Sequence, residues 1–255
     1  MRHEQFICDS PPRLEVEIRS GDVKVVKGPE GSVEVTIDGP HPEQFEVTHT
    51  GSSIVVRQEP SGSWLIASNR GAHRVTIVAP EAARLEASLA SADLAVELLL
   101  ASLQADTASG DVRAGLVSGD AAVKSASGDV RVEAVGGELR FSSASGELRV
   151  GRLGSGWLRT ASGDVVVDQA DGTIEVKTAS GNVRVSRFIG AGLSVKTVSG
   201  DFTVGIPAGT ELVFEADTMS GRVVLPDPAP AEQPAERSAR LSFRSVSGDL
   251  RVRRL

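Results

Sequence analysis

The stretch that decides the fold is TASGDVRAGLVSGDAAVKSASGDVRVEAVGGELR, residues 107–140, in which a glycine recurs every nine residues. The same small-Ser-Gly triplet first recurs at steps of 17 or 18 positions, at 108–110, 126–128, 144–146, 161–163 and 179–181. Further Ser-Gly pairs follow at 199–200, 220–221 and 247–248. A fixed period of this length indicates structural units that stack on one another.

Each repeat predicts short strands. After the glycine, apolar residues occupy alternate positions, as in DVRV (129–132) and NVRV (182–185), and such alternation is typical of a half-buried strand. A second strand is predicted in the other half of the repeat, as in TIEVKT (173–178). Stacked coils would place every inward side chain about 4.8 Å from its counterpart in the next coil. The sequence therefore predicts an all-β fold, a parallel and right-handed β-solenoid with coils of about 18 residues.

Two inward columns of apolar residues should form the core of this stack. The first comprises Val112, Val130, Leu148, Val165, Val183, Phe202, Val223 and Leu250. The second comprises Ala114, Val132, Val150, Val167, Val185, Val204, Leu225 and Val252.

Each Ser-Gly-Asp unit is interpreted as a corner of the coil. Glycine takes a positive φ without steric cost, and Asp or Asn beside it tolerates turn geometry and bonds nearby backbone. The residue before the serine, alanine in five corners, is expected to face the crowded interior. The predicted structural corner residues are Gly110, Asp111, Gly128, Asp129, Gly146, Glu147, Gly163, Asp164, Gly181, Asn182, Gly200 and Asp201.

The repeats do not extend over the whole chain. Residues 1–80 alternate like antiparallel strands joined by Gly turns, with one corner motif at 20–22, and predict a β-rich N-terminal cap continuous with the solenoid. Residues 81–255 are expected to form the solenoid itself. Within it, residues 226–240 hold four prolines and no core pattern, which predicts a surface loop before a last strand in 241–255.

Composition narrows the function classes. The 255 residues carry a net charge of −7 and only 4% aromatic residues, which disfavours nucleic-acid binding. The single cysteine, Cys8, allows no internal disulfide and no thiolate metal cluster. The N-terminus shows no signal-peptide h-region, and no apolar run is long enough to span a membrane. These features predict a cytoplasmic protein.

The repeated SASGDVRVEAVGGEL unit (125–139), the VTIVAPEAARLEAS transition (75–88) and the late GDFTVGIPAGTEL segment (200–212) resemble the bacterial "putative adhesin" β-solenoid repeat family. The resemblance covers nearly the whole chain. It implies a β-solenoid of unknown function and no catalytic residues.

The acidic corner residues should stack in one row, and two interpretations of that row are open. A row of carboxylates could bind a cation such as Ca²⁺, as nonapeptide solenoids do, but those loops need Gly-Gly-x-Gly-x-Asp, whereas here the acid directly follows a lone glycine. Asn182 also interrupts the row. The row is therefore interpreted as structural, with each acid paired to an arginine two residues later, and no metal or cofactor is predicted.

A basic column on the second strand of each repeat is the candidate interaction surface. The column comprises Lys124, Arg159, Lys177, Lys196 and Arg244. Strand parity places Leu158 inward and Trp157 outward, between Arg140 and Glu175 of adjacent coils. An outward Trp is a candidate anchor for a protein partner, and stacking on Arg140 is the alternative. The candidate surface residues are thus Trp157, Arg140, Arg159, Lys177 and Lys196.

The sequence contains no pattern that indicates catalysis. The four histidines precede the repeats without metal-ligand spacing, and no nucleophile motif or phosphate loop is present. We therefore expect no enzyme but a rigid scaffold that binds an unknown protein partner. The alternatives are self-assembly into a homo-oligomer and, less favoured, a carbohydrate- or Ca²⁺-binding β-helix.

Overall fold

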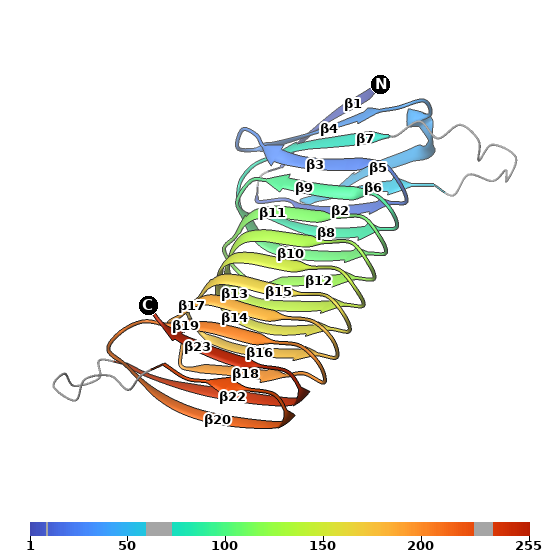
Figure 1. Cartoon of the computed structure of the whole chain (residues 1–255). Helices are drawn as coiled ribbons and strands as arrows, with labels where there is room; N and C mark the ends of the chain where they lie inside the picture. Colours follow the sequence, from blue (N-terminus) through green and yellow to red (C-terminus); the bar gives the residue numbers. More distant parts are fainter. Residues whose placement is uncertain (9, 60–72, 227–236) are drawn as a thin grey trace, which may run out of the picture. The chain divides into compact units, whose positions relative to one another are not determined.

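In a computed structural model, which describes residues 1–8, 10–59, 73–226 and 237–255, the protein is nearly all β-strand (Figure 1). One short 3-10 helix, Pro42–Gln44, is the exception among the described residues. The chain divides into two compact units, Met1–Asp129 and Val130–Leu255, which we call unit 1 and unit 2 and describe separately. The predicted boundary at residue 80 between a cap and a solenoid stays a prediction.

Unit 1 contains two rows of strands. In one row the order in space is β1 (Arg2–Ile7), β4 (Ser32–Asp38), β7 (Arg74–Ala79), β3 (Asp22–Lys27), β9 (Asp93–Glu97) and β11 (Val112–Val117). In the other it is β5 (Phe45–Thr50), β6 (Ser53–Gln58), β2 (Arg13–Ile18), β8 (Ala83–Leu89), β10 (Leu100–Thr107) and β12 (Ala121–Ser125).

The antiparallel strands expected near the N-terminus are confirmed only in part. β1–β4, β4–β7 and β5–β6 pair antiparallel. β2 and β3, which hold the 20–22 corner motif between them, instead pair in parallel with the repeat strands β8 and β9. They are inserted between strands that follow them in the sequence, so the order along the chain is not the order in space.

Unit 2 also contains two rows, and both begin with the long strands β13 (Val130–Ser143) and β14 (Leu148–Thr160). Row A continues with β15 (Val165–Ala170), β17 (Val183–Phe188), β19 (Phe202–Ile206), β23 (Leu250–Arg254) and β21 (Val223–Val224). Row B continues with β16 (Thr173–Thr178), β18 (Gly192–Lys196), β22 (Arg237–Ser247) and β20 (Thr210–Ser220). Every one of these pairings is parallel.

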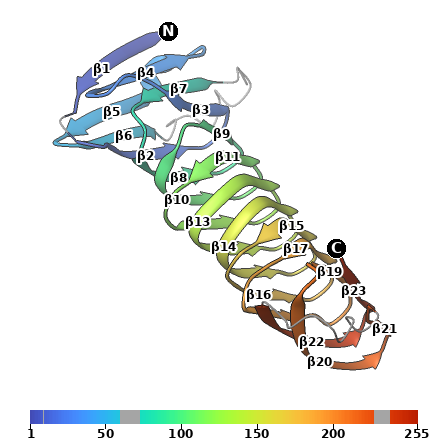
Figure 2. The ribbon, with the colours of Figure 1, turned by 90° about the vertical axis from the view of Figure 1, so that its left-hand side faces the viewer.

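The last strands of the chain are not the last strands of unit 2. β22 lies between β18 and β20 (Figure 1), and β23 lies between β19 and β21 (Figure 2). The outermost strands are therefore β20 and β21. Strand β22 begins at Arg237, so 237–240 belong to a strand and not to the expected proline-rich loop, of which residues 227–236 lie outside the described residues.

The predicted inward columns form the core, with two corrections. Fourteen of the sixteen positions are at most 5% exposed, and the Phe202 and Phe243 rings stack across the two rows at 5.9 Å. Val223 and Leu225 are 37% and 41% exposed. Both belong to the outermost layer of unit 2, where no described strand covers them.

The corner glycines are required for a different reason from the predicted one. Of the six predicted corner glycines, all of them described, only Gly200 has a positive φ, +153°. Gly110, Gly128, Gly163 and Gly181 are needed because successive corners touch: a Cβ on Gly128 would overlap the carbonyl oxygen of Gly110, and one on Gly181 would overlap that of Gly163. The alanines before the corner serines are exposed, so it is the glycine that faces the neighbouring coil.

This contact predicts that Gly128→Ala will lower the free energy of unfolding by about 3 kcal/mol or more, because the methyl group has no room. Gly51→Ala is the matched control. Gly51 has φ +62° with nothing near its missing Cβ, so the change should cost about 1–2 kcal/mol from backbone strain alone. Urea unfolding measures both, and equal losses would contradict the contact explanation.

His73 packs into a corner of unit 1. The ring is 7% exposed, lies edge-on to Phe45 at a centroid distance of 5.2 Å, and leaves its Nδ1 buried without a partner among the described residues. Burial, together with the nearby His41, lowers the pKa of His73, while Glu43 acts in the opposite direction. The fold therefore favours the neutral ring.

We expect unit 1 to lose stability as the pH falls below about 6.5, because the unfolded state then binds a proton that the folded His73 resists. The His73→Phe variant cannot bind this proton. Its free energy of unfolding should fall less than that of the wild type between neutral and mildly acidic pH, as measured by urea titration at several pH values. Parallel pH profiles would show that the burial of His73 is not what destabilises the fold in acid.

Candidate interaction face

Unit 2 brings four of the five residues of the predicted basic column into one line. Arg159 of β14 pairs in register with Lys177 of β16, Lys177 with Lys196 of β18, and Lys196 with Arg244 of β22. Adjacent strands are about 4.8 Å apart, so the four cations form a continuous strip along row B. We call this strip, together with Trp157, the basic face.

Trp157 lies at one end of the basic face. Leu158 is buried and Trp157 is half-buried, as strand parity predicted. The Arg159 guanidinium lies 4.8 Å from the centre of the indole ring, and the Lys177 ammonium lies 5.9 Å from it. These cations hold the ring against the sheet with one part open to solvent.

Arg140 lies directly across from Trp157 on β13, as the sequence indicated. Its Nε donates a hydrogen bond of 2.6 Å to Glu138, two residues earlier on the same strand. All five predicted surface residues are therefore brought together on row B. Their role in binding is a proposal taken up below.

Carboxylates neutralise only part of the basic face. Lys177 pairs with Glu175 at 2.7 Å, and the hydrogen bond it donates lowers the pKa of that carboxyl. Arg244 pairs with Glu215 at 3.4 Å. Arg159 and Lys196 form no ion pair within 4.0 Å with a described residue, although the Glu175 carboxyl lies close enough for both charges to help lower its pKa. The face is thus locally positive on a chain of net charge −7.

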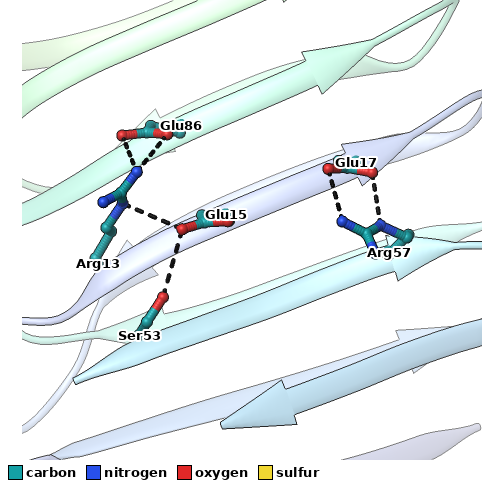
Figure 3. A network of polar contacts seen from close by, with 6 residues as sticks. All are labelled: Arg13, Glu15, Glu17, Ser53, Arg57 and Glu86. Carbon is teal, nitrogen blue, oxygen red and sulfur yellow. Dashed lines mark hydrogen bonds and ion pairs between the residues drawn. The ribbon is translucent and has the colours of Figure 1, made fainter. Parts of the chain in front are cut away.

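Lys124, the remaining member of the predicted column, lies in unit 1 and pairs with Asp106 at 3.6 Å. Several other outward charges of that unit are matched in the same way. Figure 3 shows Arg13 bonded to Glu86 and Glu15, and Arg57 bonded to Glu17 through two hydrogen bonds. The hydrogen bonds from Arg57 lower the pKa of Glu17.

The acidic corner row serves the fold through a bond that the sequence reasoning missed. The Asp164 Oδ1 accepts the backbone N–H of Asn182 at 2.7 Å, and the Asn182 Oδ1 accepts that of Asp201 at 3.1 Å. The same bond joins Asp111 to Asp129 in unit 1. Asp and Asn were expected to bond their own turn, but they bond the next corner. Asn182 therefore continues the row as a hydrogen-bond acceptor.

The predicted charge pairing along this row is found at two positions. Arg113 pairs with Asp111 at 2.8 Å, and Arg149 pairs with Glu147 at 3.1 Å. No group of three or more His, Cys, Asp or Glu side chains within the described ranges is arranged to hold a metal ion.

The corner bond predicts how Asp164 will respond to substitution. Asp164→Asn keeps an Oδ1 acceptor and should leave the free energy of unfolding within about 0.5 kcal/mol of the wild type. Asp164→Ala removes the acceptor and should cost about 1 kcal/mol. Thermal melts with and without calcium test both interpretations of the acidic corner row, as a structural feature and as a cation site. A calcium-dependent rise in Tm that Asp164→Asn abolishes would support the cation site instead.

Comparison with known proteins places the chain in a family. Residues 12–253 match the family described as Toastrack DUF4097, and the chain belongs to it. This confirms the resemblance seen in the repeats, and the Toastrack repeat fold is β-solenoid-like. No curated protein matches the chain.

Three solved structures share the fold. A "putative adhesin" from Bacteroides fragilis is 10% identical with a TM-score of 0.50, covering 98% of this chain and 96% of that one. A "putative lipid binding protein" from Parabacteroides distasonis is 15% identical with a TM-score of 0.57, covering 97% and 96%. A "putative adhesin" from the same species is 11% identical with a TM-score of 0.57, covering 98% and 96%. At these identities the likeness concerns the fold alone.

Proposed function

We propose that this Toastrack protein is a non-catalytic interaction module whose basic face binds an acidic protein partner. The observation that carries the proposal is the strip of aligned cations, two of them without an ion pair among the described residues, beside a half-buried Trp157. Aromatic and arginine side chains are the residue types that most often dominate binding energy at protein interfaces.

The stacked strands give this face the rigidity that a docking surface needs. The face lies on β14, β16, β18 and β22, whose alternate side chains are buried in the core of unit 2. A partner would therefore meet cations at a fixed spacing, with little ordering entropy to lose. We further propose right-handed coils of about 18 residues, with residues 1–80 as a cap and 81–255 as the solenoid.

The names of the fold relatives agree with an adhesin-like role, and they suggest the cell surface more than the predicted cytoplasm. None of the described residues forms a helix long and apolar enough to cross a membrane. The cytoplasmic location stays a prediction.

Self-assembly is the second candidate function, and the outermost strand of unit 2 favours it. Among the described residues, β22 is the only strand that pairs with β20. Val213, Phe214 and Met219 of β20 are exposed. An open edge strand with apolar side chains is a template for pairing with a second copy.

One experiment separates the two functions. Tagged wild type, Trp157→Ala, Lys196→Glu and the control Arg131→Glu are used to capture proteins from a lysate of the native cells, and each variant is also analysed by sedimentation. Arg131 is an exposed cation of β13 in row A, so its reversal changes net charge equally without touching the basic face.

We expect an acidic protein whose capture falls about tenfold or more with Trp157→Ala and Lys196→Glu and persists with Arg131→Glu. Equal capture by all four proteins would overturn the basic face as the binding surface. Species that grow with protein concentration, without a captured partner, would support self-assembly.

A further inference from the structure

Unit 2 has a second concentration of cations, on row A instead of row B. A hollow of about 340 Å³ lies over β17, β19 and β23. Three arginines line it, Arg184, Arg251 and Arg253, and no carboxylate side chain does. The volume is at the lower end of the range for small-molecule sites.

The register of the strands places the three arginines on the same face of row A. Arg184 of β17 pairs with Thr203 of β19, and Thr203 pairs with Arg251 of β23. The two arginines therefore lie on either side of Thr203, about 9–10 Å apart at their Cα atoms. Arg253 follows two positions along β23 and faces the same side.

Gly205 lines the hollow, with the Ser186 carbonyl oxygen and the Leu255 side chain packed close to it. It is the partner of Arg253 in the sheet, and a Cβ there would overlap the carbonyl oxygen of Ser186 and approach the Leu255 side chain to 3.1 Å. The hydroxyl-bearing residues Ser186 and Thr203 line the same hollow. The lining thus combines three arginines and two hydroxyl-bearing residues with Gly205 and the apolar residues Val185 and Leu255.

The charges of these arginines are not matched within the described part of the chain. None of the three forms an ion pair or a side-chain hydrogen bond with a described residue. Arg251 stays without an ion pair to a described residue although Asp249 stands two residues before it, whereas for Arg184 the acid itself is missing. Arg113 and Arg149 each pair with an acid two residues earlier, whereas the residue two before Arg184 is the neutral Asn182.

We propose that this hollow, the arginine pocket, binds a small phosphate-bearing anion of the diphosphate class. Guanidinium groups bind phosphate through paired N–H donors, and the fork of arginine matches two oxygens of one phosphate group. A diphosphate carries enough negative charge to neutralise three arginines, and its two phosphate groups can reach arginines on two different strands. This site is separate from the basic face, so either proposal can fail without the other.

Titration calorimetry with inorganic pyrophosphate tests the pocket. We expect saturable binding to the wild type, weakened about tenfold or more by Arg184→Ala and by Arg251→Ala, because each variant removes charge-assisted hydrogen bonds. Asn182→Asp tests the pocket without removing an arginine. The variant keeps the Oδ1 acceptor for the Asp201 N–H, so Tm should stay unchanged. It also adds an acid two residues before Arg184, as in the Asp111–Arg113 pair, so the affinity for pyrophosphate should fall.

Arg131→Ala is the matched control, since it removes one exposed cation from row A outside the pocket. Its affinity for pyrophosphate should equal that of the wild type. The proposal is overturned if the wild type shows no saturable binding, if Arg131→Ala weakens binding as much as Arg184→Ala, or if Asn182→Asp binds as tightly as the wild type.

Discussion

The fold depends on how closely successive corners approach one another. Within each unit, the corner glycine lies against the carbonyl oxygen of the corner before it, at a distance that no side chain would allow. The Asp or Asn that follows each glycine then bonds the backbone N–H of the neighbouring corner. Sheet hydrogen bonds alone would allow neighbouring strands to slip in register. The corner contacts fix the register, and thereby place every inward valine on its counterpart and every outward cation in line with the next.

Much of this arrangement could be predicted from the sequence, because a strict repeat carries its own register. The apolar alternation after each glycine indicated the buried columns, and strand parity placed Trp157 outward and Leu158 inward. The predicted reason for the corner glycines, a positive φ, was wrong at most corners, since a periodic glycine is compatible both with a positive φ and with a close contact. The hydrogen bond between corners could have been inferred from Asn182, because Asp and Asn share a side-chain oxygen acceptor but not a charge.

The order of the strands in space could not be predicted in this way. Parallel coils are related by translation, so a coil that fits between two neighbours fits equally well at many places in the stack. Four strands lie in space between strands that do not adjoin them in the sequence. They are β2 and β3 in unit 1, and β22 and β23 in unit 2. This insertion makes β20 and β21 the outermost strands of unit 2 and explains why Val223 and Leu225, which match the core pattern, are exposed.

Both candidate surfaces of unit 2, the basic face and the arginine pocket, lie where outward cations are not all paired with carboxylates. Outward arginines and lysines of unit 1 are commonly matched by a nearby carboxylate, as are Arg149 and Lys177 in unit 2. Arg159 and Lys196 on row B, and Arg184 on row A, form no ion pair with a described residue. In a repeat protein the departures from the repeat are therefore the informative positions for function, since the repeated residues are needed for the stack.

Native-state hydrogen exchange at the corner amides tests the central claim most directly. The N–H groups of Asn182 and Asp201 belong to exposed corner residues outside any strand, yet each is bonded to the side chain of the preceding corner, at 2.7 Å and 3.1 Å. If the corner contacts fix the register, both amides should be protected to nearly the same extent as the strand amide of Val183, which bonds the Asp201 carbonyl. Exchange at the rate of an unstructured peptide would contradict the account, and would leave the sheet hydrogen bonds and the core as the only source of register.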